Sequence, residues 1–206
     1  DGVVGGSFPL NGPEHTLVSG SAAVAAVTVD VRPVNASGAD FNADPANSQE
    51  VTKFRVSETS SREGIWVKKL TLYNIGTAAD SDGVDFQLVS QEGNVIATAQ
   101  AVNKNVAFDL MAAPYFIDKG LNKDFSIRAK LVNGAARTMQ LTVYNDYDLV
   151  VVGRDTGVSV LPTAGTTDAS FPIGDASNYN KATIASGTLV FNKDATSPTS
   201  ATVPGA

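Results

Sequence analysis

Hydrophobic residues recur at every second position along most of this 206-residue chain. The alternation is clearest over residues 125–131, and it returns over residues 139–144 after the turn signal Asn133-Gly134. A period of two is typical of a β-strand with one buried and one wet face. No stretch of ten or more residues keeps a helical period of 3.6. The pattern therefore predicts an all-β, antiparallel β-sandwich of about eight to ten short strands.

One stretch changes the phase of its alternation at Lys68-Lys69. The apolar residues before this pair have odd numbers (Ile65, Val67), and those after it have even numbers (Leu70, Leu72). A β-bulge inserts one extra residue and so turns the second half of a strand back toward the same core. We expect one long strand with a bulge at Lys68-Lys69.

Composition excludes several classes of protein. Hydrophobic residues make up 43% of the chain, which excludes wholesale disorder. The net charge is −6 with no basic cluster, so neither nucleic acid nor an anionic membrane surface is an expected partner. No apolar run approaches the roughly 20 residues that span a bilayer, so we expect no membrane insertion.

Cysteine is absent, which excludes disulfides, thiolate metal sites and cysteine nucleophiles. The chain is rich in small polar residues, and only 17% of its residues are charged. This usage favours an extracellular or cell-surface location. The single Asn-x-Ser/Thr sequon begins at Asn35 in an expected loop, and it is a candidate glycosylation site.

The chain divides into three regions. Residues 1–21 are expected to form a Gly-rich, flexible N-terminal arm, residues 22–186 the β-sandwich body, and residues 187–206 a C-terminal strand with a Ser/Thr/Pro tail. Within the body, residues 161–180 are expected to form a long surface loop. The expected strand at 187–194 resembles the expected strand at 26–34, so the C-terminal region resembles the first strand of another sandwich unit.

Five stretches of the body carry a family resemblance. In chain order they are EVTKFRV (50–56), EGIWVKKLTL (63–72), DFQL (85–88), IDKG (117–120) and FSIRAKL (125–131). Their order resembles the Ig-like β-sandwich repeats of long bacterial cell-surface and adhesin-type proteins, over about residues 26–160. The resemblance implies an Ig-like fold and surface display in a repeated or polymeric context, here a pilin-like subunit. It implies no catalytic residues.

Enzymatic chemistry has little support in the residues. The only histidine, His15, falls in the flexible arm, where it cannot be held beside a nucleophile. Nucleophile elbows, phosphate-binding loops and dinucleotide fingerprints are missing from the sequence. We therefore expect a non-enzymatic protein without a cofactor.

Two polar or aromatic patterns leave alternatives open. Asp80, Asp82 and Asp85 could supply oxygen ligands to calcium, or they form an acidic hairpin turn in which aspartate bonds nearby backbone. The run at 145–148 is a similar case. The second pattern is a set of aromatic residues. They form either a sugar-stacking platform or the edges of the sandwich, where the ring is buried and its polar tip stays in water. Its members are Trp66, Tyr73, Tyr115, Tyr144, Tyr147 and Tyr179.

These patterns predict a structural subunit of an extracellular filament or surface array. The sandwich is expected to be incomplete by itself and to receive a β-strand donated by a neighbouring copy, which makes the partner a homopolymer. Either terminal segment could be the donor. The candidate interface residues are Val3, Val4, Phe8, Leu10, Leu189 and Phe191. The alternative is an adhesive or carbohydrate-binding module of a longer cell-surface protein.

Overall fold

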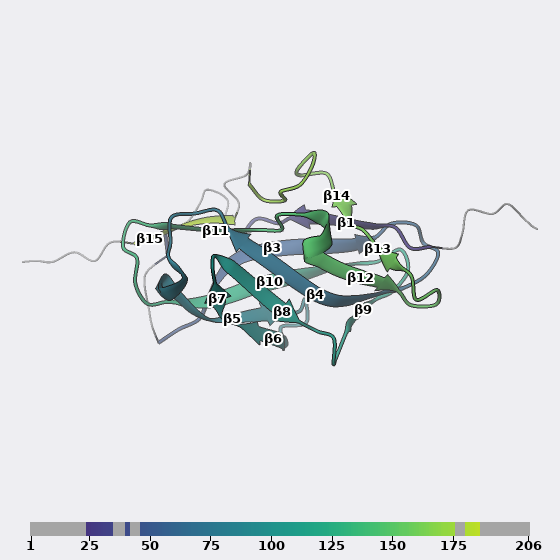
Figure 1. Cartoon of the computed structure of the whole chain (residues 1–206), viewed down its shortest axis with the longest axis horizontal. Helices are drawn as coiled ribbons and strands as arrows, with labels where there is room; N and C mark the ends of the chain where they lie inside the picture. Colours follow the sequence, from purple (N-terminus) through teal and green to yellow (C-terminus); the bar gives the residue numbers. More distant parts are fainter. Residues whose placement is uncertain (1–23, 35–39, 42–45, 176–179, 186–206) are drawn as a thin grey trace, which may run out of the picture.

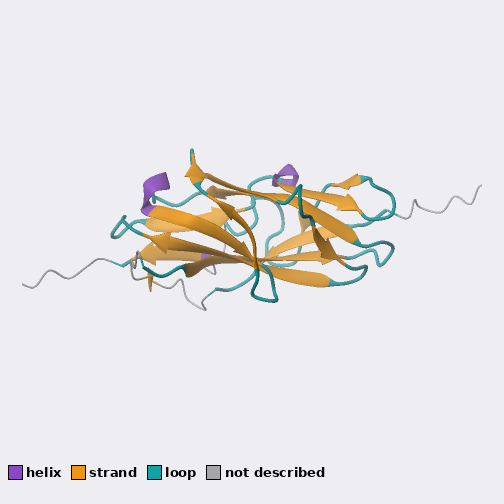
Figure 2. Cartoon of the chain, turned by 90° about the horizontal axis from the view of Figure 1, so that it is seen from below, coloured by secondary structure: helices purple, strands orange, loops and turns teal. Residues whose placement is uncertain are grey.

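A computed structural model describes residues 24–34, 40–41, 46–175 and 180–185. The described residues contain fifteen strands and two short 3-10 helices, η1 (Asp80–Asp82) and η2 (Asp146–Asp148). The strands form two sheets that overlap along the long axis of the molecule (Figures 1 and 2). The prediction of an all-β sandwich is confirmed.

The first sheet has six strands, and its neighbours are antiparallel except for one parallel pair at an edge. In spatial order its strands are β14 (Thr163–Ala164), β1 (Val27–Val31), β3 (Gln49–Glu58), β10 (Asn122–Leu131), β5 (Gly83–Val89) and β6 (Val95–Ala99). The long strands β3 and β10 form its centre. Phe54 of β3 lies directly opposite Phe125 of β10.

The second sheet is built around β4, which has partners on both sides along its length. Its main path runs through β13 (Ser159–Val160), β12 (Leu149–Gly153), β4 (Ile65–Asn74), β11 (Thr138–Thr142), β15 (Lys181–Ile184) and β2 (Asp40–Phe41). On the other side of β4 lie β8 (Asn105–Asp109) and β9 (Tyr115–Ile117), and β7 (Ala101–Val102) pairs with β8.

The core lies between the sheets and is made of the alternating apolar residues. Its four largest fully buried side chains are phenylalanines from β3, β5, β8 and β10: Phe54, Phe86, Phe108 and Phe125. Burying one such side chain contributes about 1.5–3 kcal/mol. The apolar strand faces of the described residues are thus covered within one copy of the chain, so a donated strand would have to join the sandwich along the edge of a sheet.

The bulge predicted in the long strand is confirmed. Val67 pairs with Val151 and Lys69 pairs with Val150, so Lys68 is the extra residue of β4. Val67 and Leu70 are both buried, 2% and 4% exposed, although three positions separate them. The bulge lets both halves of the strand face one core, as the change of parity indicates.

The stretch predicted as one long surface loop, residues 161–180, is instead tied to both sheets. Thr163 and Ala164 form β14 against β1, and Ile173 forms a bridge with Val143 while being fully buried. A further short strand, β15, follows at Lys181–Ile184. A few isolated apolar anchors suffice to hold this segment because they enter a core that the long strands have already built.

Candidate functional site

The two edges of the first sheet differ in how they are closed. At one edge, Thr163 and Ala164 pair with Thr28 and Val29 of β1. The chain then continues along β1, and the carboxylate of Asp30 accepts the backbone N–H groups of Thr166 and Thr167, the latter at 3.0 Å. This edge therefore has its backbone groups satisfied by the chain itself.

The other edge is β6, which pairs with β5 on one side; no strand of the described chain pairs with its other side. Its sequence, VIATA, contains neither a charged residue nor a proline, the side chains with which proteins usually guard a strand edge. Val95 is 51% exposed. A bulge at Ile96 bends the start of the strand, and Ala97–Ala99 then pairs regularly with Phe86–Leu88. We call β6 the open edge.

The core-facing side of the open edge carries small side chains. Ala97 and Ala99 lie opposite Leu88 and Phe86 and are only partly buried against the core. β6 also contacts β8 of the second sheet, so the two sheets meet at this flank. Apolar side chains of an added strand would cover the margin of the core here.

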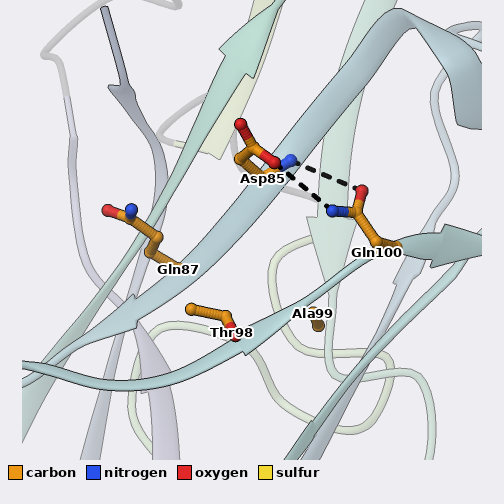
Figure 3. Close-up of a pocket in the computed structure, with 5 residues that line it drawn as sticks. All are labelled: Asp85, Gln87, Thr98, Ala99 and Gln100. Carbon is orange, nitrogen blue, oxygen red and sulfur yellow. Dashed lines mark hydrogen bonds between the residues drawn. The ribbon is translucent and has the colours of Figure 1, made fainter.

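The outer side of the open edge is polar. A hollow of 410 Å³ over β5 and β6 is lined by Asp85, Gln87, Thr98, Ala99 and Gln100 (Figure 3). Gln100 turns toward Asp85 and exchanges two hydrogen bonds of 3.4 Å with its backbone N–H and carboxylate (Figure 3). The ammonium of Lys130, 3.1 Å from this carboxylate, holds the pKa of Asp85 below its ordinary value. These groups satisfy one another on a wet face.

The three aspartates considered for calcium each have a partner of their own. Asp80 accepts the N–H of Lys104 at 2.8 Å, Asp82 is bonded by Arg137 at 2.8 Å, and Asp85 pairs with Lys130. Within the described ranges, no group of three or more His, Cys, Asp or Glu side chains is placed to hold a metal ion. The structure thus does not bring these carboxylates together as a ligand set.

The two acidic runs instead form the same kind of capped turn. In η1, Asp82 accepts the N–H of Ala79 at 2.7 Å and donates its own N–H to the Ala79 carbonyl at 3.0 Å. In η2, Asp148 does the same with Asn145, at 2.8 and 3.1 Å. Aspartate is favoured here because its short side chain bonds the backbone three residues earlier.

Two buried glutamates that no sequence pattern indicates hold the end of the sandwich where β1 begins. Glu58 accepts N–H groups from Ala26, Ser61 and Gly120, at 3.4, 2.9 and 2.6 Å, and both the N–H and the hydroxyl of Ser60. Burial acts to raise the pKa of Glu58, but these hydrogen bonds outweigh it and hold the pKa below the ordinary value. Glu58 is a structural anchor.

Glu63 has the same role for the second sheet. It accepts N–H groups from Ala25, Asp155 and Thr156 at 3.2, 2.8 and 3.0 Å, and the Thr156 hydroxyl at 2.8 Å. Burial again acts to raise the pKa of Glu63, and the hydrogen bonds led by Thr156 lower it overall. No signal in the sequence marks these carboxylates, because most of their partners lie far away along the chain.

The aromatic residues fall into separate groups. Trp66 packs on Phe116 with ring centroids 4.9 Å apart, and Arg154 lies over the Phe116 ring at 5.4 Å. Tyr115 donates a hydrogen bond of 2.6 Å to Glu92; burial, followed by this contact, raises the pKa of Tyr115 to about 12. These residues are engaged with their own neighbours.

Three other tyrosines, Tyr73, Tyr144 and Tyr147, line one hollow at the second sheet. Tyr73 and Tyr144 are in edge-on contact, with ring centroids 5.3 Å apart. The structure therefore brings together half of the six aromatic residues singled out in the sequence.

The other residues named from the sequence lie outside the described residues. They are Val3, Val4, Phe8, Leu10, His15, Asn35, Tyr179, Leu189 and Phe191. Both candidate donor segments, 1–21 and 187–206, are in this group.

No family model matches the chain, and a comparison with curated proteins found no match. Among the described residues, no helix has the length and apolar character needed to cross a membrane.

Proposed function

We propose that this protein is a non-enzymatic structural subunit of an extracellular filament or surface array, with an Ig-like sandwich as its body. Neighbouring copies are joined by a β-strand that one copy adds to the open edge of the next. The observation that carries this proposal is the open edge itself. It is an uncharged strand, and the backbone edge that faces away from β5 pairs with no strand among the described residues.

The chain carries a segment suited to that edge. Leu189 and Phe191 lie two positions apart in 187–194, and this spacing equals that of Ala97 and Ala99 on the core-facing side of β6. An added strand satisfies the exposed N–H and C=O groups of an edge, and alternate side chains enter the space beside it. Two large side chains placed beside two alanines would each contribute about 1.5–3 kcal/mol.

Such a joint is heterologous, because the donor segment and the receiving edge are different surfaces. A head-to-tail contact of this kind does not close on itself and produces filaments. Absence of cysteine, the low charged fraction and the resemblance to surface repeats support an exterior location. The N-terminal segment, with Val3, Val4, Phe8 and Leu10, is the second candidate donor.

The experiment compares assembly of the full chain with that of an edge variant, Val95→Lys combined with Thr98→Lys. Both residues are exposed, so the two lysines should leave the fold intact while blocking strand addition. Val158→Lys, exposed at the turn before β13, is the matched control. Sedimentation and negative-stain electron microscopy measure the product.

We expect filaments or higher oligomers from the full chain and from the control, and monomers from the edge variant. Chains lacking either 187–206 or 1–21 then identify the donor, because only the chain without the donor stays monomeric. An edge variant that assembles like the full chain, or a full chain that stays monomeric at high concentration, would contradict the proposal.

A further inference from the structure

A second surface, independent of the open edge, has the chemistry of a ligand site. We call it the tyrosine hollow: a depression of 380 Å³ lined by Tyr73, Asn105, Tyr144, Asn145, Tyr147 and Asp148. Its volume lies within the roughly 300–1,000 Å³ of small-molecule sites. Each of these six side chains combines an apolar or planar body with a hydrogen-bonding tip.

Three elements of the second sheet bring these residues together. Tyr73 on β4 lies directly opposite Asn105 on β8, and on its other side it pairs with Thr142 at the end of β11. Tyr144 follows two residues after Thr142, and the helix η2 then carries Tyr147. The hollow is thus built on the strands themselves and on a turn anchored to them.

The turn is held rigidly. The carboxylate of Asp148 accepts both the backbone N–H of Asn145 at 2.8 Å and its side-chain amide at 3.1 Å, which fixes the segment carrying Tyr147. Tyr144 packs edge-on against Tyr73, at an interplanar angle of 62°. A rigid display of aromatic rings lowers the conformational entropy lost on binding.

The rings are nevertheless exposed to solvent. Tyr144 is 46% exposed and Tyr147 is 64% exposed. Removing aromatic surface of this kind from water is favourable, so a ligand that covers the rings would be stabilised. The hydroxyls of Tyr73, Tyr144 and Tyr147 bond to no other described residue. The hollow therefore offers both uncovered aromatic surface and unused donors and acceptors.

Sugars match this combination. A pyranose ring has an apolar C–H face that packs on the electron-rich face of an aromatic ring, and its rim of hydroxyls both donates and accepts hydrogen bonds. Phenol and amide groups also do both, so Asn105, Asn145 and the tyrosines can satisfy such a rim. A quaternary ammonium ion would use the rings but could form no hydrogen bond with the tyrosine hydroxyls.

The charge of the site selects among sugars. Asp148 lines the hollow, Asp146 lies beside it, none of the described lining residues is Lys or Arg, and the whole chain carries a net charge of −6. Anionic sugars would meet repulsion without a compensating cation. The ligand that fits is an uncharged carbohydrate.

A neighbouring depression extends the site. It measures 370 Å³, shares Tyr144 and Asn145 with the tyrosine hollow, and is completed by Asp146, Phe171 and Pro172. Tyr144 therefore stands between two spaces, each with an aromatic wall. Two adjacent spaces of this size fit two consecutive sugar rings of one chain.

We propose that the tyrosine hollow and its neighbour bind a neutral oligosaccharide, with Tyr144 and Tyr147 as the stacking surfaces and Asn105, Asn145 and Asp148 as the polar contacts. The site lies on the second sheet, whereas the open edge belongs to the first, so a subunit could bind glycan whether or not it polymerises.

The test is a glycan array of neutral oligosaccharides of glucose, galactose, mannose and N-acetylglucosamine, with sialylated and uronic-acid glycans beside them. Array hits are then titrated by NMR with Tyr147→Ala, Tyr144→Ala and Tyr147→Phe. Tyr115→Phe, a tyrosine remote from the hollow, is the matched control. Amide spectra of each variant check that the fold is retained.

We expect a neutral glycan to bind, each alanine variant to weaken binding at least tenfold, and the control to equal the original chain. Tyr147→Phe keeps the aromatic ring, so its affinity for the glycan should fall less than that of Tyr147→Ala. Failure of all neutral glycans at millimolar concentration, a preference for acidic glycans, tetramethylammonium binding in their place, or alanine variants that bind unchanged would each overturn the proposal. The edge variant with Val95→Lys and Thr98→Lys should bind the glycan as well as the original chain, which separates this result from that of the assembly experiment.

Discussion

Thr156 donates both its backbone N–H and its hydroxyl to the carboxylate of Glu63, a residue 93 positions earlier in the chain, at 3.0 and 2.8 Å. The same carboxylate accepts the N–H of Ala25, just before β1. Since Thr156 follows β12 of the second sheet and β1 belongs to the first, one carboxylate links the two sheets at this end.

Replacing Glu63 by glutamine should destabilise the fold. Glutamine keeps the size of the side chain, but its NH₂ group would face N–H groups that need an acceptor. A buried polar group without its partner costs about 1–3 kcal/mol. We expect the free energy of unfolding in urea to fall by about that amount for Glu63→Gln.

The matched control is Glu92→Gln. Glu92 bonds Tyr115 and Lys123 at the surface, where solvent weakens such contacts, so its replacement should change stability much less. Equal effects of the two substitutions would show that Glu63 is not an anchor.

Stability should also depend on pH in the acid range. Glu58 and Glu63 have a pKa lowered from 4.5, and Asp124, beside Arg55, has a pKa lowered from 3.8, so the unfolded chain binds their protons more tightly than the folded protein does. Their contribution is complete above the unfolded pKa values and is lost as pH falls through the lower folded values.

Asp168 acts in the opposite direction. Burial raises its pKa, helped by the nearby charges of Asp175 and Asp30, so its protonation favours the folded state as pH falls. The carboxyl groups with a lowered pKa, which also include the exposed Asp85, outnumber the one with a raised pKa. We therefore expect the unfolding midpoint to fall steadily as the pH falls below about 5. Thermal unfolding in a pH series measures this, and a flat or rising midpoint would contradict it.

Periodicity was enough to predict much of the body. The alternation over 125–131 corresponds to most of β10, and the change of parity at Lys68-Lys69 corresponds to a bulge in β4. Both features are local, because they depend on which side of a strand each residue faces. The turn at Asn133-Gly134 is also local: Gly134 has a φ of +89°, which favours glycine.

Contacts between distant segments could not be predicted in this way. β15 has only Ala182 and Ile184 as buried residues, and such a short pattern becomes a strand only when β11 is beside it. The contact of Tyr73 with Tyr144 depends on the pairing of β4 with β11, which a single sequence does not show. Predicting the candidate site therefore requires the strand topology, whereas predicting the fold class requires only the two-residue period of the apolar side chains.

The centre of the first sheet offers a test of core packing. Phe54 and Phe125 lie directly opposite one another in β3 and β10, and they are 1% and 2% exposed. Phe54→Ala should lower the free energy of unfolding by about 3–5 kcal/mol, because it removes a buried ring and leaves a cavity. Met111→Ala, at a residue 62% exposed, should change it by no more than about 0.5 kcal/mol. Urea unfolding with a fluorescence readout from Trp66 compares them, and equal losses would contradict the assigned core.

The closed edge of the first sheet can be opened by one substitution. Asp30 holds the segment after β14 by accepting the N–H groups of Thr166 and Thr167, and Asp30→Ala removes both contacts. The parallel pairing of Thr163 and Ala164 with β1 is short, so the segment should detach more often. We expect faster hydrogen exchange at residues 164–167 with little change in β10.

Asp118→Ala is the control, because Asp118 is exposed and its side chain bonds only the neighbouring N–H of Lys119 among the described residues. A freed β1 edge would present a second row of unpaired backbone groups, and such edges promote association between chains. Asp30→Ala should therefore add oligomers that persist when the open edge is blocked by Val95→Lys and Thr98→Lys. If exchange at 164–167 stays as slow as in the Asp118→Ala control, the carboxylate of Asp30 is not what closes this edge.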